Sequence, residues 1–294
     1  MMRTAADLKS GKTHRDENFP VASVIIHPRH RGIILAFYRF ARAADDIADH
    51  PSASVEERLA LLDDMRRTLL GERDTVPESV SLRAMLAARG LSKEHPLDLL
   101  EAFRRDVTKL RYRDWDDLMD YCRVSAMPVG RFVLDVHGES HATWPASDAL
   151  CAALQIINHL QDCAEDYRNL DRVYIPLDAL GERGIGPESL NASRASPALL
   201  AVIAGLARRT SDLLVRAKPF ARQIRDRRLA FEVSVIQALA EDLAQGLTHR
   251  DPLSQRVHHR GSDVARIALF AAARFIGGSF RSRLNAPKIA DGRP

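Results

Sequence analysis

The stretch FYRFARAADDIAD, residues 37–49, joins an apolar helical pattern to a run of carboxylates. Its apolar residues recur at the spacing of one helix face, which predicts a helix over residues 30–48. Asp45 and Asp49 are four residues apart, so on that helix they lie on one face, one turn apart. Like charges at this spacing destabilise a helix slightly in water and more strongly where the dielectric is low. A sequence that carries this charge within apolar surroundings indicates bound multivalent cations.

A second stretch, LQIINHLQDCAEDY at residues 154–167, repeats the arrangement. Asn158, Asp162 and Asp166 follow one another at intervals of four, and Gln155 lies one turn before Asn158. Mg²⁺ prefers oxygen ligands and is usually held by one or two carboxylates together with substrate phosphates. Two such polar stripes on facing helices predict a site for a metal–diphosphate cluster. The alternative is that each stripe is the exposed face of an amphipathic helix.

Two arginines, Arg39 and Arg42, precede the first acidic run by one to two helical turns. A guanidinium can grip phosphate oxygens with two parallel hydrogen bonds, so both side chains are candidates for diphosphate binding. A helical ion pair between Arg42 and Asp46 is the alternative.

The composition excludes several classes of function. A net charge of +4 over 294 residues is too weak to indicate nucleic-acid binding, and no stretch interleaves basic with aromatic residues. Neither a dinucleotide-binding glycine pattern after a strand nor a phosphate-binding P-loop is present, so we expect no nicotinamide site. The spacing of Cys122, Cys151 and Cys163 fits no zinc site and predicts buried free thiols in a reducing compartment. No apolar run is long enough to span a bilayer, which favours a cytoplasmic protein.

Nearly every segment of the chain predicts helix. We expect a capping box at Ser54–Glu57 to open a helix over 58–70, and Ser196 to cap a helix that begins beside Pro197. The other expected helices cover 114–137 with a kink at Pro128, 145–170, 198–218, 219–246 and 262–277. Only residues 173–176 favour an extended conformation, and the linkers at 71–80, 181–187 and 249–261 are short. One all-α domain over residues 1–294 is therefore expected.

The two acidic stretches, together with RVYIP at 172–176, resemble the squalene/phytoene synthase family of isoprenoid enzymes. The resemblance covers residues 18–246. It implies an all-α isoprenoid synthase bundle around a central cavity, with the acidic motifs facing each other. It also implies a prenyl diphosphate substrate and several Mg²⁺ ions that bridge the diphosphate.

Matched position by position, the resemblance assigns roles to individual residues. The predicted metal ligands and catalytic carboxylates are Asp45, Asp49, Asp162 and Asp166, with Asn158 as a further metal ligand. The predicted diphosphate-binding residues are Arg42, Arg172 and Tyr174. By their position, Arg39, Asn158 and Gln155 complete that set.

One stretch, YCRVSAMPVGR at residues 121–131, departs from the family pattern. It lacks the second tyrosine and places Met127, followed by Pro128, at the position where relatives usually carry glycine. Tyr121 is the remaining candidate for the catalytic tyrosine, and ordinary helix packing is the alternative. The departure, with ENFPVAS at 17–23, is similar to the hydroxysqualene synthase branch called HpnC.

That branch implies a carbon–oxygen lyase of squalene and hopanoid biosynthesis, working beside companion enzymes. It would ionise presqualene diphosphate and quench the cation with water. Head-to-head condensation of two prenyl diphosphates is the alternative activity. The apolar, arginine-flanked stretch at 264–276 predicts either packing on the bundle or contact with a membrane surface.

Overall fold

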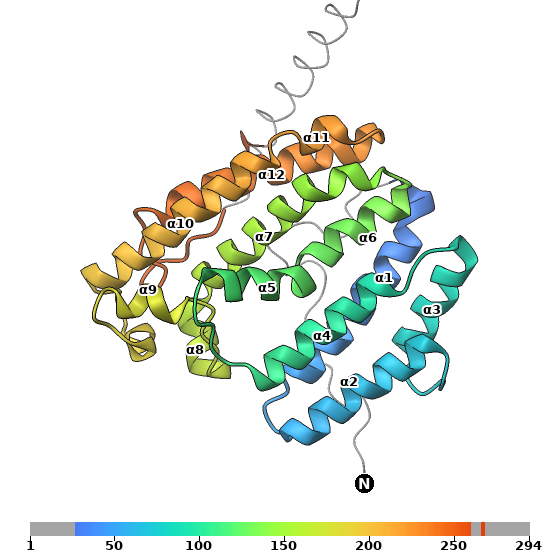
Figure 1. The fold of residues 1–294 in the computed structure, drawn as a ribbon, viewed down its shortest axis with the longest axis horizontal. Helices are drawn as coiled ribbons and strands as arrows, with labels where there is room; N and C mark the ends of the chain where they lie inside the picture. Colours follow the sequence, from blue (N-terminus) through green and yellow to red (C-terminus); the bar gives the residue numbers. More distant parts are fainter. Residues whose placement is uncertain (1–26, 260–265, 268–294) are drawn as a thin grey trace, which may run out of the picture.

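The computed structural model describes residues 27–259 and 266–267, and this part of the chain is a bundle of helices (Figure 1). The α-helices are α1 Pro28–Ala48, α2 Val55–Leu70, α3 Pro77–Arg89, α4 Glu94–Thr108, α5 Trp115–Ser125, α6 Met127–His137, α7 Trp144–Gln161, α8 Cys163–Leu170, α9 Leu177–Gly181, α10 Pro197–Ala217, α11 Phe220–Gln223 and α12 Arg227–Leu247. Short 3₁₀ turns lie at His141–Thr143 and Pro187–Asn191. The described residues form no β-strand, and the predicted extended segment makes an isolated bridge between Arg111 and Val173. The all-α prediction is confirmed.

The predicted helix starts are found where the sequence places their caps. The Ser54 hydroxyl accepts from the backbone N–H of Glu57, whose carboxylate accepts from the N–H of Ser54, so the capping box is present. The Ser196 hydroxyl accepts from Leu199 at the start of α10. Such side chains satisfy donors that the first turn of a helix leaves without partners.

Three predicted helices are each divided in two, which corrects the sequence prediction. Pro128 ends the expected helix over 114–137 outright, because proline lacks an N–H and its ring clashes with the carbonyl four residues earlier. Asp162 interrupts the expected helix over 145–170 with φ −101° and ψ 7°. Asp226 leaves the helical conformation and caps α12 by accepting from two backbone N–H groups. In addition, α3 and α4 lie in a region for which no helix bounds were predicted from the sequence.

The buried apolar residues form two clusters. One lies among α5, α7, α10 and α12, and the other among α1, α2, α3 and α4. Helix α6 contributes Leu134 to the first cluster and Phe132 to the second, so it connects them. Because α6 is shared, we infer one domain. The first acidic motif belongs to the α1 side and the second to the α7–α8 side, so the candidate site lies where the clusters meet.

Two predicted features fall mainly outside the described residues. These are the stretch at 17–23 and the C-terminal helix at 262–277, of which residues 266 and 267 are helical. Contact with a membrane surface therefore stays a prediction. Within the described ranges, no helix has the length and apolar character needed to cross a bilayer. The cysteines are free thiols, as predicted, with Cys122 and Cys163 buried and Cys151 half-buried.

Candidate active site

The first acidic motif occupies the last turn of α1. The backbone N–H of Asp49 donates to the carbonyl of Asp45 over 2.9 Å and ends the helix. A helix C-terminus carries a partial negative charge, so carboxylates are unfavourable there. Arg42 offsets part of this charge, because its two Nη atoms lie 2.8 Å from Asp45 Oδ2 and 2.9 Å from Asp46 Oδ1. The predicted Arg42–Asp46 pair is thus present, together with a pair to the motif's first carboxylate.

The second motif lies at the junction of α7 and α8. Asp162 is the residue between the two helices, and Asp166 lies in the first turn of α8, where the partial positive charge of a helix start favours carboxylates. The side chains of Asn158, Asp162 and Asp166 belong to half-buried residues. Gln155 points along α7 instead, with its Nε2 atom 3.0 Å from His159 Nε2.

The guanidinium of Arg172 joins the first acidic motif to the end of α4. Its Nη1 lies 2.6 Å from Asp49 Oδ1, and Nη2 donates to the carbonyl of Ala48 over 3.2 Å. Its Nε donates to the carbonyl of Asp106 in the last turn of α4 over 3.0 Å. One buried guanidinium therefore joins the C-terminal ends of α1 and α4, where a cation is favourable.

Local backbone geometry places Arg172 at this position. Asp171 ends α8 in the left-handed conformation with φ 52°, and the N–H of Arg172 then donates back to Asp166 over 3.1 Å. The following residues run beside 110–113, with the N–H of Val173 donating to Leu110 over 2.9 Å. The RVYIP stretch is thereby held between α8 and the end of α4.

Burial and neighbouring carboxylates raise the pKa values of two of the acidic side chains, Asp45 and Asp166. We call Asp45, Asp49, Asp162 and Asp166 the carboxylate cluster. Burial and the charge of Asp49 raise the pKa of Asp45 to about 7, against the opposing effect of Arg42. Burial and the charge of Asp162 raise the pKa of Asp166 to about 7, with Asp49 adding to the effect and Arg172 opposing it. The Asp45 side chain keeps 35% of its surface exposed, so it is recessed yet reachable by a ligand. Because the charge of Asp49 acts on the pKa of Asp166, the two motifs lie near each other.

A buried network that the sequence reading missed lies beside this cluster. Asp106 accepts from Tyr121 Oη over 2.8 Å and from Tyr174 Oη over 2.9 Å, and we call these three residues with Arg172 the Asp106 network. Burial raises the pKa of Asp106 to about 6, while Arg172 and the two tyrosine hydrogen bonds oppose that rise. The signal was available in the sequence, because Asp106 continues the apolar face of α4 that contains Leu99 and Ala102. A carboxylate on a buried helix face indicates a paired, specific role.

An aromatic group surrounds the network. His159 stacks on Tyr174 with ring centroids 3.5 Å apart and planes 11° apart, and Tyr112 stacks on Tyr174 at 5.5 Å. Burial, with Arg172 nearby, lowers the pKa of His159 to about 3, so its imidazole is neutral. Tyr121 is buried and its hydroxyl is held by Asp106, and burial raises its pKa well above the ordinary value.

Not every predicted residue joins the site. Arg39 is exposed on α1, and within the described chain its side chain makes no recorded contact with the carboxylate cluster. Its role in diphosphate binding stays a prediction.

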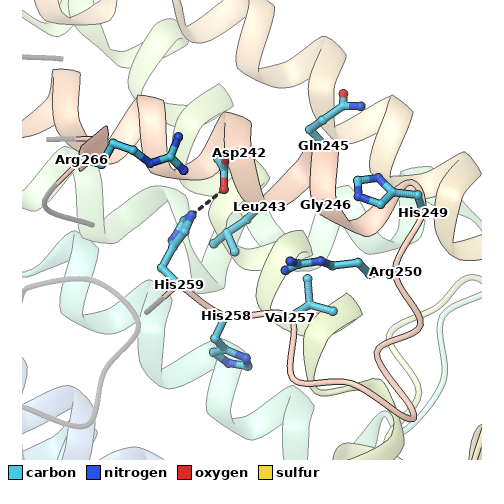
Figure 2. A pocket seen from close by; sticks show the side chains of 10 residues that line it. All are labelled: Asp242, Leu243, Gln245, Gly246, His249, Arg250, Val257, His258, His259 and Arg266. Atoms are coloured by element: carbon cyan, nitrogen blue, oxygen red, sulfur yellow. Dashed lines mark hydrogen bonds and ion pairs between the residues drawn. The ribbon is translucent and has the colours of Figure 1, made fainter. Parts of the chain in front are cut away.

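A separate basic pocket of about 230 Å³ lies between α12 and residues 249–259 (Figure 2). Its wall includes His249, Arg250 and His258, and His259 Nε2 lies 2.9 Å from Asp242 Oδ2. Burial lowers the pKa of His258, and the charge of Asp162 opposes that shift. The pocket therefore adjoins the second motif from the C-terminal side.

The donor set of the carboxylate cluster fits hard divalent cations. It offers carboxylate oxygens and no thiolate, and its four carboxyl groups outnumber the two neighbouring guanidiniums of Arg42 and Arg172. The excess charge is what a bound cation would neutralise.

Comparison with known proteins assigns the family. Residues 12–263 match the squalene/phytoene synthase family. The chain belongs to that family. It is 61% identical to a hydroxysqualene synthase of Rhodopseudomonas palustris over 92% of each chain. It is 55% identical to a hydroxysqualene synthase of Zymomonas mobilis over 92% of this chain and 91% of that one.

A solved structure agrees with this assignment. The crystal structure of squalene synthase HpnC from Alicyclobacillus acidocaldarius is 32% identical to this chain and superposes with a TM-score of 0.70. The match covers 83% of this chain and 91% of that one. The predicted family and the predicted isoprenoid synthase bundle are thereby confirmed.

Proposed function

We propose that this protein is a hydroxysqualene synthase, which converts presqualene diphosphate and water to hydroxysqualene with release of diphosphate. The observation that carries the proposal is the position of Arg172: its backbone N–H donates to Asp166 of the second motif and its guanidinium pairs with Asp49 of the first. The support from relatives is the 61% identity of the chain to a hydroxysqualene synthase. The reaction is a carbon–oxygen bond cleavage followed by capture of the cation by water.

Asp45, Asp49, Asp162 and Asp166 would hold Mg²⁺, with Asn158 as a neutral oxygen donor. Bound Mg²⁺ would supply Lewis-acid stabilisation of the negative charge that develops on the departing diphosphate. The raised pKa values of Asp45 and Asp166 support this assignment, since both groups would bind a cation with release of protons near neutral pH.

Arginine and tyrosine side chains of the chain would stabilise the charges that develop during the reaction. Arg42 and Arg172 orient carboxylates of the first motif through ion pairs of 2.6–2.9 Å, and their positive charge favours a departing anion. Asp106 accepts hydrogen bonds from the hydroxyls of Tyr121 and Tyr174. Both phenols would therefore stay neutral beside a developing carbocation. Aromatic faces attract cations, so Tyr174 and its neighbours could stabilise the rearranging cation without providing a nucleophile.

Substitution of one carboxylate in each motif tests the proposal. Purified Asp45→Asn and Asp162→Asn proteins should lose Mg²⁺-dependent turnover of presqualene diphosphate by at least about a hundredfold, because charge stabilisation of this kind contributes several kcal/mol to catalysis. Asp63→Asn, on α2, is the matched control, because its side chain is 46% exposed and lies outside the site, and it should keep full activity. Circular dichroism should show the same helix content in all three variants.

Product analysis separates the proposed reaction from head-to-head condensation. Mass spectrometry should detect hydroxysqualene from presqualene diphosphate. Formation of presqualene diphosphate, squalene or a phytoene-type product from farnesyl or longer prenyl diphosphates would instead assign the alternative activity. Retained turnover in the Asp162→Asn protein would contradict the metal-site assignment itself.

A further inference from the structure

A second polar cluster lies at the opposite end of α1 from the carboxylate cluster. It consists of His30 at the start of α1, His137 at the end of α6 and Asp226 at the cap of α12, and we call it the histidine site. One potential ligand atom from each residue lies within 4.8 Å of the other two. The rise of an α-helix separates His30 from Asp45 by about 22 Å, so the two clusters are independent sites.

Hydrogen bonds fix the ligand atoms of two of the three residues. The Nδ1 of His137 lies 2.8 Å from the carbonyl of Val133, which is an acceptor, so Nδ1 carries the proton and Nε2 carries the lone pair. Metal-bound histidines commonly show this arrangement, because a carbonyl behind the ring fixes its tautomer. Asp226 Oδ1 accepts from the N–H groups of Arg228 and Leu229, which leaves Oδ2 to face His137.

The spacing of these atoms suits an ion better than a direct hydrogen bond. His137 Nε2 and Asp226 Oδ2 are 4.0 Å apart, too far for a hydrogen bond, although the His137 side chain is only 1% exposed. Two ligands bound tetrahedrally to Zn²⁺ at about 2.1 Å lie roughly 3.4 Å from each other. A shift of about half an ångström would therefore bring both atoms into coordination distance.

The surrounding contacts hold the three helices in place around the site. Glu139, directly after α6, accepts from the backbone N–H groups of Arg225 and Asp226 over 2.9 and 2.8 Å. The rings of His30 and His137 lie 4.2 Å apart between centroids. The cap of α12 is thereby tied to the end of α6, and both face the first turn of α1 (Figure 1).

Two arginines lie beside His30, and their positive charges oppose a bound cation at the histidine site. Arg29 Nε lies 2.8 Å from His30 Nε2, and Arg89 Nη1 lies 3.4 Å from His30 Nδ1. A neutral imidazole accepts at only one nitrogen, so only one of these contacts can be a hydrogen bond. Arg89 is also held by the backbone carbonyl of Arg29, whereas Arg29 is exposed and can turn its side chain into solvent.

From these contacts we propose that His30, His137 and Asp226 form a binding site for a borderline divalent transition metal of the Zn²⁺ class. Two imidazoles and one carboxylate suit such ions, whereas the carboxylate cluster suits Mg²⁺. Three protein ligands leave the fourth position to water. The bound ion joins the start of α1 to α6 and α12, at the far end of the helix that presents Asp45.

Metal titration of the full chain tests this site. Isothermal titration with ZnCl₂, in buffer containing excess Mg²⁺ to saturate the carboxylate cluster, should show one Zn²⁺ per chain. CoCl₂ should give visible d–d absorption typical of a site with nitrogen and oxygen ligands. The Asp162→Asn variant is the matched control and should bind Zn²⁺ as the unaltered protein does.

Asp226→Asn is the decisive variant, because asparagine also caps helix starts and so preserves α12. It should weaken Zn²⁺ binding by more than roughly a hundredfold, since loss of an outer-shell partner alone costs about 10- to 100-fold. His137→Ala should act likewise, and melting curves check that both variants fold. Arg29→Ala removes a competing donor and a positive charge, so it should tighten binding roughly three- to tenfold. Absence of Zn²⁺ binding, or equal binding by the Asp226→Asn protein, would overturn the proposal.

Discussion

The carboxylate cluster and the Asp106 network share Arg172, yet they differ in how their charges are balanced. In the network, both Asp106 oxygens accept a hydrogen bond from a buried tyrosine and the guanidinium lies alongside. In the cluster, burial and the charges of neighbouring carboxylates raise the pKa values of Asp45 and Asp166. The first arrangement is complete within the chain and stabilises the fold. The second stores repulsion that a cationic ligand would relieve, which is the usual compromise between stability and function at a binding site.

Replacement of Asp106 should produce the largest change in stability. Asp106→Ala leaves the hydroxyls of Tyr121 and Tyr174 buried without their acceptor, and it removes an anion beside Arg172. Each buried hydroxyl that is left without its acceptor costs about 1–3 kcal/mol. Denaturant unfolding followed by circular dichroism measures the loss. The hydrogen bond from Arg172 to the backbone carbonyl at position 106 is kept in this variant, so the change isolates the side chain.

Asp106→Asn is the control for shape, since it keeps one carbonyl acceptor at the same position. Its stability should lie between those of Asp106→Ala and the unaltered protein. If the free energy of unfolding of Asp106→Ala lies within about 1 kcal/mol of the unaltered value, the Asp106 network does not stabilise the fold as proposed.

Replacement of Asp166 should stabilise the protein near neutral pH, whereas replacement of Asp106 should destabilise it. A carboxyl group whose folded pKa is raised to about 7 from about 3.8 is protonated in the folded chain where the unfolded chain is ionised. The unfolded state then binds fewer protons, so stability is greatest below about pH 4 for this group and falls as the pH rises toward 7. Asp45 adds the same dependence.

In Mg²⁺-free buffer, Asp166→Asn should therefore flatten the decline of the melting temperature between about pH 5 and about pH 8 and leave the protein more stable at the upper end. Mg²⁺ should raise the melting temperature of the unaltered protein more at about pH 8 than at about pH 5. The exposed Asp63→Asn variant should keep the original slope. If Asp166→Asn melts at a lower temperature throughout this range, the repulsion described for the cluster is wrong.

The same two regions show what a sequence can predict. The carboxylate cluster was predictable because its residues recur at helical spacing within short stretches, so periodicity places Asp45 beside Asp49 without knowledge of the fold. The family resemblance further predicts that Arg172 and Tyr174 lie near the diphosphate, which stays a prediction. Helix starts were predictable for the same local reason, as Ser54 and Ser196 show.

The Asp106 network was not predictable in this way, because its members come from α4, α5 and the segment after α8. Only tertiary packing brings Asp106 to Tyr121 and Tyr174, and nothing local marks the three as partners. The breaks at Asp162 and Asp226 were missed for a related reason. Both lie in sequence that favours helix, and the interruption is set by what the flanking helices pack against.

Within the aromatic group, the same substitution, tyrosine to phenylalanine, should have different effects on stability at two positions. Tyr174 donates its hydroxyl to Asp106, whereas the hydroxyl of Tyr112 is buried and has no hydrogen-bond partner among the described residues. Tyr174→Phe should cost about 1.5–3 kcal/mol, the range for a hydrogen bond to a charged group, whereas Tyr112→Phe should be neutral or stabilise by up to about 1 kcal/mol. Both changes keep the ring stacking, so chemical denaturation of the pair isolates the hydroxyl. Equal losses from the two variants would show that the rings, and not the hydrogen bonds to Asp106, carry the stability of this region.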